Sequence, residues 1–285
     1  MNRAGSIDYA GARLWARFGA RPDENAWRRI EPVREFAALI DAARGTALQP
    51  WLQGIAAHTS AHEIEALLRA RWQALVAEIA DWMPEAWQPA ILWCATLPYL
   101  PILLHLARRG APLPWMRDDP LLRDLCVDDR GAARAALAAG RWAPLAAAWA
   151  TPDALPAAWR AEWWRRMPPH PGGDPRLIVA LARTLTTHLA ENAGASIREG
   201  WALRRALQAR LAVHFRRAIL DPAAAFVFLA IAALDFERLR GELLRRVAFP
   251  GLPLAAMSAT GRPERESVPL GGMARSAQGA PLEPR

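Results

Sequence analysis

The stretch that decides the fold is 60-SAHEIEALLRARWQALVAEIADWMP-84. Ser60, followed three positions later by Glu63, forms a capping-box pattern, which marks the first turn of a helix. Apolar residues then recur with the spacing of one helix face, namely Ile64, Leu67, Leu68, Trp72, Leu75, Val76, Ile79 and Trp82. The sequence therefore predicts a helix over 61–83 that buries one apolar stripe. We expect its opposite face to meet water or a partner through Arg69, Arg71, Gln73 and Glu78.

Helical signals continue on both sides of this stretch. Pro32 and Gly45 bound one expected helix, and Ser196 with Glu199 forms a second capping box that begins another. Asp221-Pro222 begins the last helix, whose first part, 223–234, is apolar and is expected to be buried on most sides. Because no stretch alternates apolar and polar residues as strands do, the fold class is all-α, a bundle of several helices.

One domain is expected over residues 1–250. With 53% hydrophobic residues, the chain can bury a sizeable core, and the proline-rich stretch 168–175 is a weak internal boundary. Residues 251–285 are rich in Gly, Pro, Ser, Ala and Arg without periodicity, so we predict a disordered tail there. The two capping boxes, each followed by a long helix, also leave open an internal duplication.

The most apolar run, AILWCATLPYLPILLHLA at 90–107, allows three interpretations. Its length approaches that of a membrane span, and two arginines follow it. Pro98 and Pro101 at its centre each remove a backbone donor and kink a helix. A buried, broken core helix is therefore favoured over a membrane span or a segment at the membrane interface.

The chain is basic through arginine alone. All 36 basic residues are Arg, against 28 Asp and Glu, for a net charge of +8. A GC-rich genome explains the lack of lysine, because Lys codons are poor in G and C. Many arginines come in pairs at the ends of expected helices, where the helix dipole favours cations, so nucleic-acid binding is not expected. The N-terminus lacks the apolar segment of a signal peptide, which indicates a cytoplasmic protein.

No motif indicates catalysis, a metal or a cofactor. His58 and His62 have metal-type spacing, but Ser60 is the expected start of a helix, which leaves His58 in the preceding loop. The aspartates of 118–129 lack a second acidic motif on a later helix with which to hold Mg²⁺. Nucleotide loops that need lysine are excluded, and Cys94 lies in an apolar run, where burial raises the pKa of a thiol. We therefore expect a non-enzymatic protein.

A tryptophan–arginine cluster lies in AAWRAEWWRRMPP at 157–169, an expected short helix. Its aromatic and basic side chains suit a membrane interface or the groove of a partner. The candidate contact residues are Trp159, Trp163, Trp164, Arg165 and Arg166. Core packing is the alternative for the tryptophans.

Three short patterns resemble the family of adaptors that join the central stalk to the membrane ring in V/A-type rotary ATPases. The first is a Tyr-x-x-Ala-Arg pattern in an early helix, formed here by Tyr9, Ala12 and Arg13. The second begins a long helix, with Glu63, Ile64, Glu65 and Leu68. The third lies in the last helix, with Phe236, Glu237, Arg238, Leu239 and Arg240.

The resemblance implies stacked helical units around a funnel, without catalytic residues or cofactors. One end would contact the rotor stalk and the other the ion-translocating ring, at the inner face of the cell membrane, with Arg238 and Arg240 as further contact residues. The alternative hypothesis is a helical scaffold or regulatory protein that binds an acidic protein partner or an anionic membrane surface.

Overall fold

The computed structural model describes residues 6–169 and 172–249, and every regular element in these ranges is a helix. The all-α prediction is therefore confirmed. The α-helices are α1 (Ile7–Gly19), α2 (Glu24–Ile30), α3 (Phe36–Arg44), α4 (Ala61–Trp82), α5 (Gln88–Trp93), α6 (Leu100–Ala107), α7 (Pro114–Asp118), α8 (Arg130–Ala139), α9 (Leu155–Arg165), α10 (Pro175–Ala193), α11 (Ile197–Arg217) and α12 (Ala223–Ala248).

Short 3-10 helices connect several of these elements. They are η1 (Gln49–Leu52), η2 (Glu85–Trp87), η3 (Cys94–Tyr99), η4 (Arg123–Leu125), η5 (Ala143–Ala150) and η6 (Pro152–Ala154). All described residues belong to one compact unit. The predicted tail, 251–285, lies outside the described residues.

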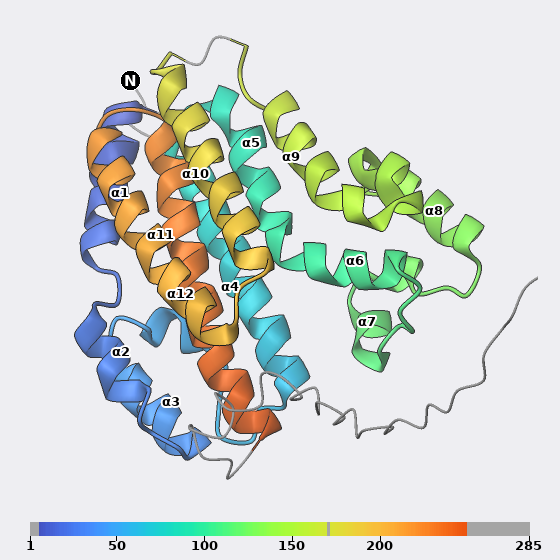
Figure 1. The fold of residues 1–285 in the computed structure, drawn as a ribbon, viewed down its shortest axis with the longest axis horizontal. Coiled ribbons are helices and arrows are strands. Elements are labelled where there is room, and N and C mark those ends of the chain that lie inside the picture. Colours follow the sequence, from blue (N-terminus) through green and yellow to red (C-terminus); the bar gives the residue numbers. More distant parts are fainter. Residues whose placement is uncertain (1–5, 170–171, 250–285) are drawn as a thin grey trace, which may run out of the picture. The chain divides into compact units, whose positions relative to one another are not determined.

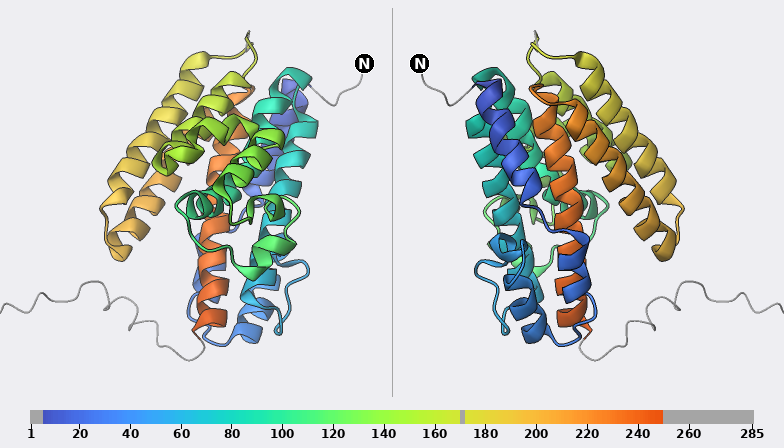
Figure 2. Two further views of the ribbon diagram at one scale, coloured as in Figure 1. Left: turned by 90° about the vertical axis from the view of Figure 1, so that its right-hand side faces the viewer. Right: turned by 90° about the vertical axis from the view of Figure 1, so that its left-hand side faces the viewer.

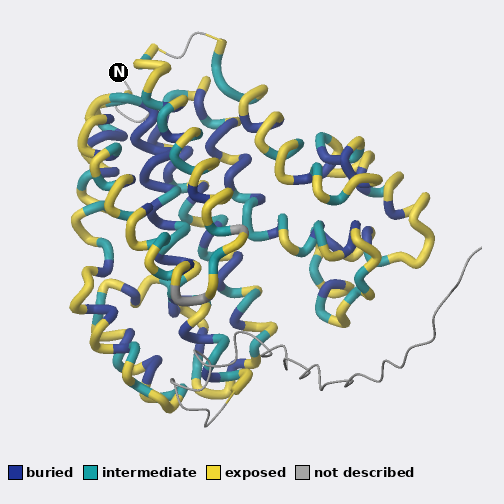
Figure 3. The backbone as a smooth tube through the Cα atoms, viewed as in Figure 1, coloured by how far each residue is buried: buried dark blue, intermediate teal, exposed yellow. Residues whose placement is uncertain are grey.

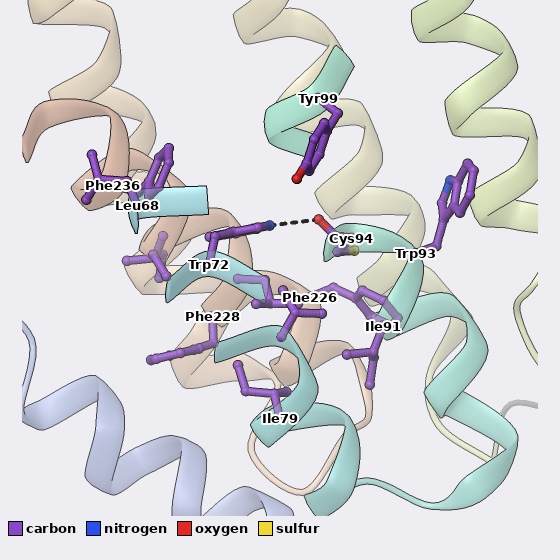
Figure 4. Close-up of a cluster of buried hydrophobic side chains, with 14 of the residues drawn as sticks. Leu68, Trp72, Ile79, Ile91, Trp93, Cys94, Tyr99, Phe226, Phe228 and Phe236 are labelled. Carbon is purple, nitrogen blue, oxygen red and sulfur yellow. Dashed lines mark hydrogen bonds between the residues drawn. The ribbon is translucent and has the colours of Figure 1, made fainter. Parts of the chain in front are cut away.

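Helices α4 and α12 pack side by side at the centre of this unit (Figure 1). Helix α4 begins at the predicted capping box, where Ser60 and Glu63 each accept the other's backbone N–H. Most of the predicted apolar stripe is buried. In its middle, the indole Nε1 of Trp72 donates to the backbone oxygen of Cys94 at 2.9 Å, and the ring packs against Phe236 (Figure 4). This buried hydrogen bond ties α4 to η3.

Helix α12 begins with apolar, buried residues, as the sequence predicts, and continues with charged ones. Residues 223–229 are all buried, whereas the second half carries charged side chains that pair with other segments. Each ion pair ties α12 to a different part of the chain, through Arg21–Asp235 at 2.7 Å, Arg238–Glu24 at 3.1 Å and Arg240–Glu65 at 2.5 Å.

Arg246, near the end of α12, donates hydrogen bonds at the C-terminal end of α2. It is only 6% exposed. Its guanidinium donates to the carbonyl oxygens of Ile30, Glu31 and Val33 at 2.6–3.1 Å, and also to the Glu242 carboxylate at 2.6 Å. The last carbonyls of a helix have no partner within that helix. Arg246 supplies donors to the carbonyl oxygens of Glu31 and Val33, and it adds a second hydrogen bond at Ile30, whose oxygen also accepts the N–H of Val33.

The apolar run 90–107 folds as a bent core element. Helix α6 runs across the direction of α5 (Figure 1), with Pro98 inside η3 and Pro101 in the first turn of α6. Among the described residues, Glu85–Ala107 is the one stretch long and apolar enough to cross a membrane, with a mean hydropathy of 1.7. In the fold, Trp93, Cys94 and Leu103 of this stretch belong to the core, in agreement with the favoured interpretation.

The expectation that Arg69 faces water or a partner is wrong. Arg69 is 4% exposed. Its guanidinium carbon lies 4.8 Å from the ring centroid of Trp115 and 5.5 Å from that of Tyr99, and the Asp119 carboxylate is 3.5 Å away. Helix α7 and the residues after it cover this side of α4, and the helical period of α4 alone carries no information on such a distant segment.

Helices α10 and α11 form an antiparallel hairpin that packs on α12 mainly through α11. Phe215 of α11 is 1% exposed and stacks on Phe18 of α1, with 4.5 Å between ring centroids. Both views in Figure 2 show that the end of the hairpin where α10 passes into α11 stands away from α12. The hairpin is therefore anchored at one end, and much of its surface is free.

Two histidines lie in the hairpin. His188 is 7% exposed, and its Nδ1 has no hydrogen-bond partner among the described residues. His214 shares a 3.2 Å hydrogen bond with the Thr184 hydroxyl across the two helices. Burial, reinforced by the nearby positive charge of Arg210, lowers the pKa of both imidazoles below the ordinary value. Both are therefore packed as neutral groups.

We expect the protein to lose stability as the pH falls from about 7.5 to about 5.5. In this range the unfolded chain binds more protons at His188 and His214 than the folded chain does, because their folded pKa values are lowered, so acid favours unfolding. Urea unfolding at the two pH values measures the effect. A variant with His188→Leu and His214→Leu should lose most of this dependence, and an unchanged dependence in that variant would contradict the assignment.

Candidate functional site

Two tryptophans of the predicted tryptophan–arginine cluster pack inward. Trp159 donates its Nε1 to the Thr96 hydroxyl at 2.7 Å and stacks on Trp93. Trp163 is 7% exposed and meets Phe226 of α12 edge to face, with 5.2 Å between ring centroids. The core-packing alternative therefore holds for these two side chains, which fix α9 against η3 and α12.

The two arginines of the cluster share one buried carboxylate. Glu162 is 6% exposed and accepts from Arg165 at 2.6 Å and from Arg166 at 2.7 Å. These hydrogen bonds hold the pKa of the Glu162 carboxyl below its usual range. The Arg166 guanidinium also lies 4.5 Å from the Trp93 ring centroid. Arg166 is therefore held within the fold, whereas the Arg165 side chain remains 70% exposed.

The third tryptophan, Trp164, lines a groove, which we call the Trp164 groove. It has a volume of about 350 Å³ and lies between η2, the end of α9 and the start of α10. Trp164 is 40% exposed, so this wall is open to solvent. The apolar walls are formed by Trp87, Trp164, Met167, Pro168, Pro169, Pro175, Ile178 and Val179.

Two carboxylates, Asp174 and Asp221, also line the Trp164 groove. Asp174 caps α10 by accepting the N–H of Arg176 at 2.9 Å. Asp221 accepts the N–H of Asp174 at 2.7 Å and that of Ala223 at 2.8 Å, so it joins the starts of α10 and α12. Gly173 permits this approach, because a Cβ there would lie 2.6 Å from Asp221 Oδ2.

The other two predicted contact residues form ion pairs with other parts of the chain. Arg238 pairs with Glu24 and Glu31, its guanidinium lies 4.4 Å from the Trp27 ring centroid, and its side chain is 13% exposed. Arg240 pairs with Glu65 and Glu237. The structure does not bring these two residues together with the tryptophan–arginine cluster, and they hold α12 against α2 and α4.

The residues behind the rotor-adaptor resemblance also have internal contacts. Ile64, Leu68 and Leu239 are completely buried, and the Glu65–Arg240 ion pair joins α4 to α12. Tyr9 and Arg13 of α1 lie in contact, with 5.7 Å between the guanidinium carbon and the ring centroid. In this fold, these patterns serve the packing of one bundle.

An exposed stripe on α11, which we call the α11 face, was not predicted from the sequence. Its residues recur at the three-and-four spacing of one helix face, and all are exposed: Ala202, Arg205, Ala206, Ala209, Val213 and Arg216. Figure 3 shows that α10, the other helix of this hairpin, is also largely exposed on its outward side. A helical projection of 197–217 would have revealed the stripe, opposite the buried Leu207, Leu211 and Phe215.

The arginines of the α11 face differ from those of α12. Among the described residues, Arg205 and Arg216 have no carboxylate within 4.0 Å, and Arg210 on the same helix pairs with Glu191 at 3.7 Å. The hydrogen bond from Arg238 is the main cause that lowers the pKa of Glu24, and the charge of Arg205 contributes to it at longer range. The α11 face therefore presents positive charge that no ion pair within the described residues neutralises.

Potential catalytic groups are sparse in the described part of the chain. It contains no group of three or more His, Cys, Asp or Glu side chains placed to hold a metal ion. Burial raises the pKa of the Cys94 thiol to about 12, as its place in the apolar run predicts. Burial also raises the pKa of Cys126. The Trp164 groove and the α11 face are therefore taken as the candidate binding surfaces.

No family model, curated protein or solved structure matches this chain.

The tryptophans of α9 should differ sharply in their effect on stability. Trp163→Ala should lower the free energy of unfolding by about 3–5 kcal/mol, the usual cost of deleting a buried aromatic ring. Trp164→Ala should cost about 1 kcal/mol, because its exposed ring lies at the groove wall. Urea unfolding of both variants measures these losses. An equal loss of unfolding free energy in the two variants would contradict the placement of Trp163 inside the core and of Trp164 at the surface.

Proposed function

We propose that this protein is a non-catalytic helical binding protein that docks through its α11 face onto an acidic helix of a partner protein. The observation that carries the proposal is the exposed stripe itself. Arg205 and Arg216 have no ion pair with any described residue, and small side chains lie between them. The proposal is a more specific form of the alternative hypothesis from the sequence, a helical scaffold that binds an acidic partner.

The small side chains set the geometry of docking. Ala206 and Ala209 lie between the two arginines, and the distance between packed helix axes depends on the side chains at the contact. A partner helix can therefore lie close to α11. Arg205 and Arg216 are separated by about 16 Å along the axis at the rise of an α-helix. A partner helix with carboxylates three turns apart would meet both guanidinium groups, which pair well with carboxylates in a bidentate manner.

An anionic membrane surface fits the α11 face less well. Helices that lie in the membrane interface insert large apolar side chains such as Trp, Phe and Leu. The α11 face offers alanines and Val213, which is 44% exposed. Larger exposed side chains exist elsewhere, at Leu189, Ile219 and Leu220, but they lie off the stripe that carries Arg205 and Arg216. A protein helix is therefore the favoured partner.

The rotor-adaptor hypothesis stays a prediction, together with its implied location at the inner face of the membrane. A helical subunit with a free binding face such as the α11 face is compatible with this hypothesis. Purification of the protein together with rotor-stalk and ring subunits would support that identity, and the acidic helix would then belong to one of those subunits.

Site-specific photo-crosslinking tests the proposal in cells that express the full chain. A benzophenone amino acid is placed at Ala209, in the centre of the α11 face, or at Ala138, an exposed alanine of α8 that serves as the control. We expect a discrete protein adduct from position 209 and none of the same mass from position 138. Mass spectrometry should identify an acidic helix at the crosslinked site.

Charge reversal separates the proposal from its alternatives. With Arg205→Glu and Arg216→Glu added, the adduct from position 209 should fall at least about tenfold, because two attractive pairs become repulsive. An adduct that survives charge reversal, or the same adduct from both positions, would contradict the proposal. Binding to phosphatidylglycerol vesicles that depends on Arg205 and Arg216, without a protein adduct, would favour the membrane instead.

A further inference from the structure

The Trp164 groove has a charge opposite to that of the protein as a whole. The chain carries a net charge of +8, yet Asp174 and Asp221 are the charged residues among the described residues that line the groove. The arginines at the end of α9, Arg165 and Arg166, form ion pairs with Glu162. The groove thus combines apolar walls with a local negative charge.

The size of this charge can be judged from the two helices that begin here. Asp174 lies at the start of α10, and Asp221 lies just before α12. Each helix N-terminus contributes about half a positive charge, so the two carboxylates retain roughly one negative charge between them. A single guanidinium or ammonium group would neutralise it.

The apolar walls of the Trp164 groove favour a ligand that carries an apolar group next to its cation. Trp164 is 40% exposed, and Ile178 and Val179 of α10 line the same groove. Tryptophan rings also attract cations that lie over their faces, most strongly where water is excluded. An apolar side chain against these walls would place a neighbouring cation within reach of Asp174.

The volume of the Trp164 groove indicates whether it fits a free small molecule or a side chain of a larger partner. About 350 Å³ is at the lower end of the range for small-molecule sites. Such sites also cover most of their ligand, whereas the exposed ring of Trp164 shows that one wall is open. A groove of this kind suits one or two side chains of a partner whose remaining mass lies outside.

We propose that the Trp164 groove binds a peptide segment of a partner protein in which one arginine or lysine stands next to apolar residues. The apolar side chains pack against Trp164, Ile178 and Val179, and the cation lies near the carboxylates of Asp174 and Asp221. This site is independent of the α11 face, which carries the opposite charge.

Fluorine NMR of the full chain labelled with 5-fluorotryptophan provides the test. The probe is the peptide acetyl-Gly-Leu-Leu-Arg-Gly-Ser-amide, and its controls carry citrulline or glutamate in place of arginine. Trp164→Phe assigns the resonance of Trp164. We expect the arginine peptide to shift this resonance and to leave that of Trp142, a buried residue outside the groove lining, in place. Citrulline has nearly the same shape without charge, so its peptide should bind about tenfold more weakly.

Asp174→Asn is the decisive variant, because asparagine caps a helix as well as aspartate does but carries no charge. This substitution should weaken the binding of the arginine peptide about tenfold and leave the binding of the citrulline peptide unchanged. The control variant is Asp128→Asn, at an exposed acidic residue outside the groove lining. It should change the binding of neither peptide.

Three results would overturn the proposal. The first is equal binding of the arginine, citrulline and glutamate peptides, which would show that charge has no part in recognition. The second is the absence of any Trp164 shift at several millimolar peptide, a concentration that detects even weak complexes. The third is an equal response to methylguanidinium alone, which would assign the groove to a small cation.

Discussion

The constraint on which the rest of the structure depends is the burial of α12. Its first half has no exposed side, since residues 223–229 are all buried, and each large apolar side chain buried there stabilises the fold by roughly 1.5–3 kcal/mol. Its second half fixes the position of its neighbours through charge. Arg246 is the most constrained of these groups, because its guanidinium satisfies three carbonyl oxygens at the end of α2 and is itself almost inaccessible to water.

The arginines of α12 and those of the α11 face have different surroundings. Those of α12 form ion pairs with other residues of the fold, as Arg238 does with two glutamates beside the Trp27 ring. Those of the α11 face, Arg205 and Arg216, have no ion pair among the described residues. The difference matters for function, because an arginine that already holds two helices together contributes little to binding, whereas one without such a pair is available to a partner. The α11 face is therefore the surface through which we propose that the protein binds.

The periodic parts of the fold could be predicted from the sequence, and the parts that depend on distant segments could not. The capping box at Ser60 and the stripe through Trp72 located α4 correctly, since both signals are local. The burial of Arg69 depends on Trp115 and Asp119, far along the chain, and nothing in the period of α4 indicates it. The candidate site shows the same limit. Local composition pointed to Trp164, but the carboxylate of Asp221 reaches its groove only because α12 begins beside α10.

The measurement that tests the central place of α12 most directly is the free energy of unfolding of Arg246→Met, determined by urea denaturation beside Arg29→Met. Methionine keeps much of the apolar stem but removes the guanidinium donors from the carbonyl oxygens of Ile30, Glu31 and Val33 and from the Glu242 carboxylate. We predict a loss of about 3–5 kcal/mol, as for the removal of one partner from a buried charged pair. Arg29→Met, at an exposed position on α2, should stay within about 0.5 kcal/mol of the unsubstituted protein. Equal and small losses in the two variants would contradict the central place given to α12.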